Sequence, residues 1–346
     1  MSQKLTLSVL DIGPIRSNQS ATDCFNSMIE LAKHGEDLGY NRYWLAEHHN
    51  VAAVAASHTA SLAPVIGAHT KRIRIGGCVL LAHYPPLLVA EQMGIVEACY
   101  PGRVDLGIGR STGADWATSS LLRGDTETKS DEAMISDLTN LLALNRPEGL
   151  TVAQDGREFT FQAVPNATGA PAPWILGTSW YSAQLAAELG LPYAFGYHIR
   201  AEGAKEAIAL YREKFRPSAY LAEPRVLVSA IVVIGETDLE AERLARPQLF
   251  FMSSFRSGEP VKSQMLVEEA DGDEFPAHHE RLVKMFRSSW IIGSPDHAAK
   301  AVANLAADLG CSEIMINPVA AAYSSQPKDR APNREFTLAA LAERLS

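Results

Sequence analysis

The stretch Tyr43-Trp44-Leu45-Ala46-Glu47-His48-His49-Asn50 passes from apolar to polar residues within one short segment. Its first three residues are two aromatics and a leucine, a composition that predicts the start of a buried strand. Its end consists of an acid, two imidazoles and an amide. Because α/β enzymes place their chemistry at the carboxyl ends of buried strands, this stretch predicts a strand that opens onto an active site.

Further apolar segments of strand length lie along the 346-residue chain, and each is followed by a helix or a helical region. The eight expected strands are Leu5–Leu10, the opening of Tyr43–Asn50, Arg72–Leu81, Val104–Gly109, Trp174–Leu176, Tyr193–Tyr197, Arg225–Ile234 and Ser312–Ile316. Strand–helix alternation predicts a parallel sheet, and eight units favour a closed (β/α)8 TIM barrel over an open doubly wound sheet. No glycine-rich dinucleotide fingerprint follows the first strand. We expect one α/β domain over residues 1–346.

Two segments depart from this alternation. Thr151–Gln162 reads as an inserted hairpin, with Asp155-Gly156 as its turn. Between Pro247 and Phe286 the periodic pattern weakens and two further prolines interrupt it. This second segment predicts a long mobile loop near the seventh unit.

Composition excludes several classes of function. The net charge of −9 and the pI near 5.6 argue against nucleic acid and anionic membranes as partners. The four cysteines lie far apart without a C-x-x-C pair, so we expect reduced thiols in the cytoplasm, with neither a disulfide framework nor a metal site. No apolar run approaches the ~18 residues that span a bilayer. The N-terminal residues also lack the pattern of a signal peptide.

Three other strand ends could bind a ligand. Leu106–Gly113 is rich in glycine, which permits close approach to the backbone, and Arg110 could meet an anion. Leu176-Gly177-Thr178-Ser179 precedes a helix and could form a phosphate cradle, although an ordinary N-cap explains it equally and the two interpretations are compatible. Leu80–Tyr84 could support a flat ring or simply pack in the core. The adjacent histidines could likewise be a structural pair, and they are poorly placed to share a metal ion.

At these residues the sequence resembles the bacterial luciferase-like flavin monooxygenases. The matching stretches follow in order: Tyr43–Asn50, Pro86–Gln92, Pro101–Arg110, Trp174–Ser179, Ala186–Pro192 and Ile292–Pro295. Together they span nearly the whole chain. They are most similar to the subgroup with an E-H-H strand end and an L-G-S-S-like phosphate turn, in which the third residue here is Thr178.

The resemblance implies a barrel that binds reduced FMN over its strand ends, with His48 as the catalytic residue beside the flavin ring. Gly177, Thr178, Ser179 and Ser182 would hold the phosphate with help from Arg110. Leu81-Ala82 would lie behind the ring, at a position where family members often have a non-proline cis peptide. The complete set of expected cofactor-binding residues is Leu81, Ala82, Gly109, Arg110, Leu176, Gly177, Thr178, Ser179 and Ser182.

The resemblance also implies a two-component reaction. A separate reductase would supply FMNH2, and O2 would form a flavin 4a-hydroperoxide that oxygenates a small organic substrate. The Pro247–Phe286 segment would exclude water, and His48 would hydrogen-bond or shuttle a proton at the peroxide. The expected substrate-contacting residues are Tyr84, Trp116, Tyr197 and Phe251.

Some features leave alternatives open. The luciferase catalytic subunit has a cysteine where this chain has Gly109, which points to a relative with different substrate chemistry. A deazaflavin-dependent oxidoreductase and a non-catalytic flavin-binding protein are the competing hypotheses. The substrate is not readable, since relatives use aldehydes, alkanes, sulfonates and aromatic polyketide intermediates. Family members commonly pair through helices near the second and third strands, so we expect a homodimer involving the helix Ser57–His69.

Overall fold

The computed structural model describes residues 5–111, 113–124, 127, 129–165 and 169–345. Thr112, which belongs to one of the expected glycine-rich strand ends, lies outside these ranges. No helix within them is both long and apolar enough to cross a membrane.

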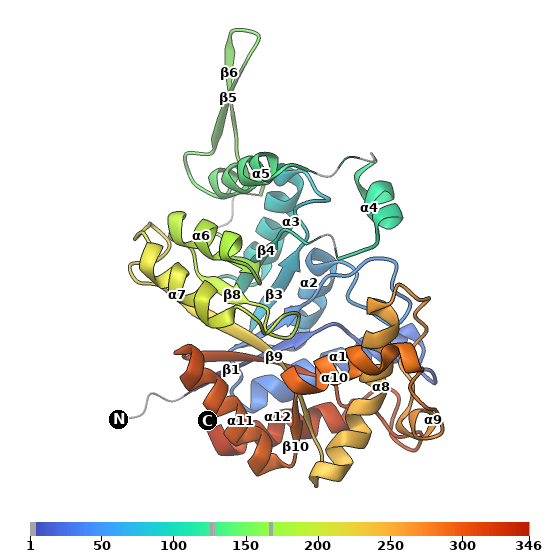
Figure 1. The fold of residues 1–346 in the computed structure, drawn as a ribbon. Helices are drawn as coiled ribbons and strands as arrows, with labels where there is room; N and C mark the ends of the chain where they lie inside the picture. Colours follow the sequence, from blue (N-terminus) through green and yellow to red (C-terminus); the bar gives the residue numbers. More distant parts are fainter. Residues whose placement is uncertain (1–4, 112, 125–126, 128, 166–168, 346) are drawn as a thin grey trace.

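Eight parallel strands close into a barrel with helices around it, which confirms the predicted (β/α)8 architecture (Figure 1). The barrel strands are β1 (Thr6–Asp11), β2 (Arg42–Leu45), β3 (Arg74–Val79), β4 (Val104–Gly109), β7 (Ala172–Gly177), β8 (Tyr193–Phe195), β9 (Val226–Ile234) and β11 (Glu313–Pro318). Each pairs with its successor, and β11 pairs with β1 to close the ring. A ninth parallel strand, β10 (Ile291–Gly293), was not predicted. It is short and pairs with the end of β9, beyond the part of β9 that pairs with β8.

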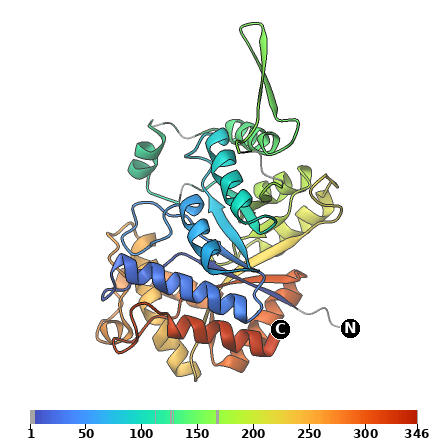
Figure 2. The same cartoon turned by 180° about the vertical axis from the view of Figure 1, so that it is seen from behind.

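The helices pack against the outside of the barrel, as the two opposite views show (Figures 1 and 2). They are α1 (Ala21–Asp37), α2 (Thr59–His69), α3 (Pro86–Cys99), α4 (Trp116–Arg123), α5 (Asp131–Leu144), α6 (Trp180–Glu188), α7 (Ala204–Lys214), α8 (Asp238–Arg256), α9 (Val267–Asp271), the 3-10 helix η1 (Ala277–His279), α10 (Glu280–Ser289), α11 (Pro295–Leu309) and α12 (Pro332–Leu345). Pro86 and Pro295 occupy first-turn positions, where the missing N–H of proline costs nothing.

The segment from Pro247 to Phe286 is more regular than predicted. Helix α8 continues through Pro247 to Arg256, and α9, η1 and most of α10 occupy much of the remainder. Proline normally breaks a helix interior. Here Pro247 is itself buried, between Leu244 and Leu249 of an apolar cluster, so packing offsets the lost hydrogen bond.

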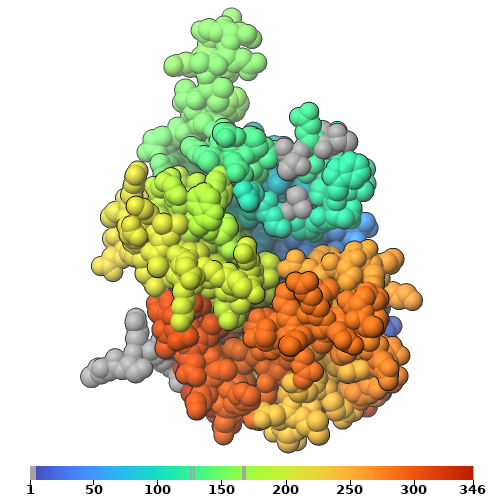
Figure 3. Space-filling view, viewed as in Figure 1, coloured from blue at the N-terminus to red at the C-terminus, as the bar shows by residue number. Residues whose placement is uncertain are grey.

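The predicted hairpin is confirmed. It consists of β5 (Leu150–Gln154) and β6 (Arg157–Phe161), which pair antiparallel around the Asp155-Gly156 turn. It projects away from the barrel, and residues 151–161 are all exposed (Figures 1 and 3). The barrel therefore does not depend on the hairpin for its core.

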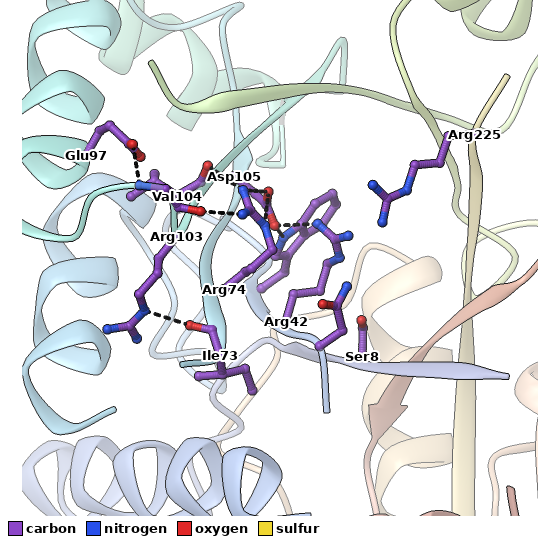
Figure 4. Close-up of polar contacts among 12 residues, drawn as sticks. Ser8, Arg42, Ile73, Arg74, Glu97, Arg103, Val104, Asp105 and Arg225 are labelled. Atoms are coloured by element: carbon purple, nitrogen blue, oxygen red, sulfur yellow. Dashed lines mark hydrogen bonds and ion pairs between the residues drawn. The ribbon is translucent and has the colours of Figure 1, made fainter. Parts of the chain in front are cut away.

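The interior of the barrel is filled with side chains. Large residues from several strands, including Trp44, Trp174 and Met315, form one buried cluster. Below them, at the amino ends of the strands, Arg42 pairs with Asp105 at 2.6 Å (Figure 4). It also pairs with Glu313 at 2.6 Å. All three side chains are almost completely buried. This network closes the end of the barrel opposite to the predicted site.

Candidate functional site

The segments that follow β2, β3, β4, β7 and β8 surround the carboxyl end of the barrel, which we call the mouth. Each predicted site motif lies on one of these segments, because parallel strands bring their carboxyl ends to the same side.

Glu47 organises the segment after β2. Its side chain is buried, and Oε2 accepts a 3.0 Å hydrogen bond from the backbone N–H of Thr59, at the start of α2. Oε1 lies 2.9 Å from the hydroxyl of Tyr84 and 3.2 Å from Nε2 of His49. Glu47 and His49 therefore have a supporting position. Tyr84 belongs to the same network, and its predicted contact with substrate stays a prediction.

His48 has one ring nitrogen anchored and one available. Its Nδ1 lies 3.0 Å from the carbonyl oxygen of Ala46. A carbonyl only accepts, so Nδ1 carries the proton and Nε2 of the neutral ring has a free lone pair. Burial lowers the pKa of His48, which favours this neutral form.

His198 is a second histidine at the mouth, and sequence reasoning missed it. It follows β8 by a few residues, and its Nδ1 lies 2.6 Å from Oγ of Ser229 on β9. Burial, followed by the charge of nearby His48, lowers the pKa of His198 to about 4. The rule that identified His48, a polar residue directly after a buried strand, would have identified His198 as well.

The turn after β7 has the geometry expected of a helix N-terminus. Ser179 caps α6, and its side chain and that of Ser182 form a capping box. Ser182 is buried, and its hydroxyl also lies 3.1 Å from that of Tyr193, so both serines are satisfied inside the turn. The N-cap interpretation is correct, and it leaves the first N–H groups of the helix and the half-buried Thr178 available to an anion.

Gly177 and Gly109 differ in the space beside them. A Cβ on Gly177 would lie 2.1 Å from Oγ of Ser182, so only glycine fits there. A Cβ on Gly109 would meet nothing closer than Leu176, at 3.8 Å. The buried backbone at Gly109 therefore makes only an ordinary contact on this side, and the lack of a side chain suits the close approach of a flat ligand.

Arg110 lies beside the first turn of α6. Its guanidinium is 5.0 Å from the ring centroid of Tyr181, and it forms an exposed 2.8 Å ion pair with Asp131. A positive side chain and a helix N-terminus thus lie together, a combination that attracts phosphate. The remaining predicted cofactor residues, Leu81 and Ala82, are buried directly after β3.

The Leu81–Ala82 peptide bond, where family members often have a non-proline cis peptide, is not cis in this chain. Val164–Pro165 is the one cis bond among the described residues.

The other predicted substrate residues come from different segments of the chain. Trp116 is 69% exposed on α4, Tyr197 is half-buried after β8, and Phe251 stacks on Phe255 within α8. Two pockets of about 350 and 430 Å³ are lined by other residues and include none of the predicted site residues. Tyr84, Tyr197 and Phe251 are partly buried against the same apolar core, whereas Trp116 is exposed, so a common substrate surface stays a prediction.

One group of potential metal ligands occurs within the described part of the chain. Nε2 of His278 and Nε2 of His279 lie 2.7 and 3.1 Å from Oε1 of Glu259. His279 is buried, and its Nδ1 has no hydrogen-bond partner, whereas metal-binding histidines normally donate that group to a neighbour. We therefore interpret the group as a hydrogen-bonded cluster. All four cysteines are free thiols, as predicted.

Sequence comparisons match almost the whole chain to one family. The model described as luciferase-like monooxygenase matches residues 6–313. The chain is 35% identical over 314 residues to the uncharacterized protein YvbT of Bacillus subtilis, with 90% of each chain covered. It is 33% identical over 322 residues to a luciferase-like monooxygenase of Escherichia coli, covering 90% and 91%. It is 30% identical over 244 residues to the N-acetyl-S-alkylcysteine monooxygenase of B. subtilis, covering 69% and 70%.

Solved structures show the same fold. Apo-MsnO8 has a TM-score of 0.81 at 31% identity, with 99% of both chains covered. The oxygenating constituent of 3,6-diketocamphane monooxygenase from Pseudomonas putida, in complex with FMN, has a TM-score of 0.72 at 18% identity, covering 99% and 98%. An F420-dependent secondary alcohol dehydrogenase has a TM-score of 0.68 at 13% identity, also covering 99% and 98%.

Proposed function

Because the chain belongs to the luciferase-like monooxygenase family, we propose that it oxygenates a small organic substrate with O2 and reduced FMN supplied by a separate reductase. The observation that carries this proposal is the placement of Arg110 beside the first turn of α6, next to the uncrowded backbone of Gly109. An anion and a flat ring can thus be bound side by side.

The residues of the mouth fit FMN. Arg110, Thr178 and the free N–H groups of α6 would hold the phosphate, and the capping box of Ser179 and Ser182 would fix that turn. Gly109, Leu176, Leu81 and Ala82 would form the apolar seat of the ring. When bound, reduced flavin supplies the activation of O2.

His48 is the proposed catalytic residue of this chain. Its neutral Nε2 can accept a proton or a hydrogen bond at the mouth, while Nδ1–H is held by Ala46. The lowered pKa of His48 keeps this lone pair available at neutral pH. The apolar strand ends would exclude water.

The competing cofactor is a deazaflavin. One structural neighbour is F420-dependent, and another holds FMN, yet both are below 20% identity and therefore support the fold alone. Titrating the purified protein with FMN and with F420 separates the two hypotheses by affinity. Tighter binding of F420 would contradict the proposal.

Activity is tested with FMN, a flavin reductase, NADH and O2, with a panel of organic substrates and with oxygen uptake as the signal. We expect substrate-dependent product in the wild type. In His48→Ala we expect flavin binding to persist while oxygen consumption is diverted to hydrogen peroxide. Flavin binding without product from any compound would favour the non-catalytic alternative, and wild-type yields in His48→Ala would disprove the role of His48.

We extend the proposal to a homodimer in the cytoplasm. The free cysteines support a reducing compartment. Apolar side chains of α2 and α3 are unusually exposed, among them Val65 at 39%, Leu88 at 43% and Ile95 at 49%. Such residues on adjacent helices are a suitable surface for a second copy.

A further inference from the structure

His198 is fixed by two contacts to Ser229, which leave one ring nitrogen unused. Its backbone N–H donates to the carbonyl of Ser229 at 3.0 Å, and Nδ1 lies 2.6 Å from Oγ of the same residue. The Ser229 hydroxyl donates to the carbonyl of Phe195 at 3.3 Å. When the hydroxyl donates to Phe195, Oγ accepts from Nδ1–H of His198, and Nε2 then keeps a lone pair.

The ring of His198 adjoins the proposed phosphate turn. Gly196 donates its N–H to the carbonyl of Gly177 at 3.0 Å, which ties the segment after β8 to the end of β7. A Cβ on Gly196 would lie 3.2 Å from Cγ2 of Thr178 and 3.7 Å from Cε1 of His198. His198 is therefore a near neighbour of Thr178 across a single glycine.

The same ring lies at the same end of the barrel as His48, because β8 and β2 are parallel strands of one barrel. A charge on His48 is the one side-chain charge that lowers the pKa of His198. From α8, Arg256 approaches this segment through the carbonyl of Ile199 at 3.3 Å and does not contact the imidazole. Two neutral rings, each anchored through Nδ1, thus leave their Nε2 atoms available at one mouth.

We propose that His198 is a second ligand-binding histidine of this site, whose Nε2 accepts a hydrogen bond from an N–H or O–H group of the bound flavin. Ser229 is its positioning residue, because its hydroxyl fixes the ring and the tautomer. The identity of the ligand rests on the function proposed above, but the placement of the ring does not.

A purely structural histidine is the competing explanation. Such a ring would gain its stability from both nitrogens or from packing, yet no hydrogen bond from Nε2 to a described residue is seen, and the ring is difficult to protonate where it lies. An anchored imidazole with one free lone pair is instead the arrangement expected of a group that receives a ligand.

The test uses the full chain with 15N-labelled histidine and anaerobically reduced FMN as the probe. In the free protein, NMR should show His198 neutral with the proton on Nδ1. FMN should shift the Nε2 signal of His198 but not that of His69, an exposed histidine on α2. His198→Gln should weaken FMN binding roughly 5–10-fold, as expected for one hydrogen bond.

Two variants of Ser229 test whether this residue positions the ring of His198 or only stabilises the fold. Ser229→Ala should lose the fixed tautomer and weaken FMN binding, and Ser229→Thr, which keeps the hydroxyl, should restore both. His69→Gln is the matched control and should bind FMN as the wild type does.

The outcomes separate this inference from the proposed function. If the wild type binds FMN while the His198 signal stays unchanged and His198→Gln binds equally well, the inference is wrong and the function stands. If the wild type does not bind FMN, the proposed function fails. The placement of His198 at the same mouth as His48 is then tested with the His48→Gln variant. A raised pKa of His198 in that variant supports the shared mouth, and an unchanged pKa overturns it.

Discussion

The hydroxyl of Tyr84 donates a 2.9 Å hydrogen bond to Oε1 of Glu47, which links the segment after β3 to the segment after β2. Burial and this carboxylate together raise the pKa of Tyr84 well above its usual range. The pair explains why the E-H-H stretch begins with an acid: Glu47 joins two strand ends and the start of α2, and His48 is presented from that frame.

Glu47→Gln should destabilise the protein by about 1–3 kcal/mol, because a buried acceptor of three hydrogen bonds loses its charge and one of its oxygens. Urea unfolding measures the change. Glu158→Gln, on the exposed hairpin, is the control and should change stability by less than about 0.5 kcal/mol. Equal effects of the two substitutions would rule out a structural role for Glu47.

Gly109→Ala should fold normally and bind FMN at least about tenfold more weakly. The new methyl group would make only an ordinary contact with Leu176, at 3.8 Å, so folding should be unaffected while the proposed seat of the ring is narrowed. Thermal unfolding and FMN titration measure the two effects separately.

Gly177→Ala is the matched comparison for that variant. Its methyl group would lie 2.1 Å from Oγ of Ser182, so both the melting temperature and FMN affinity should fall. If Gly109→Ala binds FMN as tightly as the wild type, the seat of the ring lies elsewhere.

Asp105→Asn should cost about 3–5 kcal/mol, because Arg42 would remain buried with one of its two partners uncharged. Denaturant unfolding gives the value. Asp308→Asn removes an exposed ion pair with Lys205 and should be nearly neutral. A loss at Asp105 no larger than at Asp308 would show that the buried network does not stabilise the barrel.

Wild-type stability should fall relative to His198→Gln as the pH drops from about 6.5 to about 4. The folded pKa of His198 is depressed to about 4, so in this window the unfolded chain binds the extra proton and native stability is lost. The loss from this group is at most about 3 kcal/mol. Above pH 6.5 the difference between the two proteins should be constant.

Urea unfolding at several pH values measures this difference. Tyr197→Phe, which removes no group that titrates in the same range, should follow the wild-type curve with a constant offset. A pH-independent difference between the wild type and His198→Gln would show that His198 is not buried in the native state.

Ile95→Glu should convert a dimer into a monomer, because it places a charge on the exposed apolar face of α3. Light scattering measures the mass. Leu239→Glu alters an exposed leucine on α8, 76% accessible, and should leave the mass unchanged. A monomeric wild type would refute the homodimer directly.

The barrel was predictable because its signals are local. Apolar strands alternating with helices set the topology, and polarity at the strand ends located Glu47, His48 and the turn at Gly177. His198 also follows a strand, the expected Tyr193–Tyr197, but a single histidine at that position belongs to no recognisable motif. Its partner Ser229 lies in another strand, 31 positions away.

The buried ion network could not be predicted. Arg42 bonds with Asp105 and Glu313, which lie 63 and 271 positions further along the chain. In the local sequence, each of these charged residues looks like the polar end of a strand. The helix through Pro247 was missed for a related reason. Its stability comes from the cluster around Leu244 and Leu249, and the local proline signal indicates the opposite.

The closed amino end of the barrel affects the order in which ligands can bind and leave. With Arg42 and Asp105 buried beneath Trp44 and Trp174, the barrel axis offers no second route for a ligand. Under the proposed function, cofactor and substrate would both enter through the carboxyl end. Whichever of them binds deeper would then enter first and leave last, so a bound flavin would leave only after a substrate or product that lies above it. Steady-state kinetics of such a protein should therefore be ordered, with inhibition when the outer ligand arrives early.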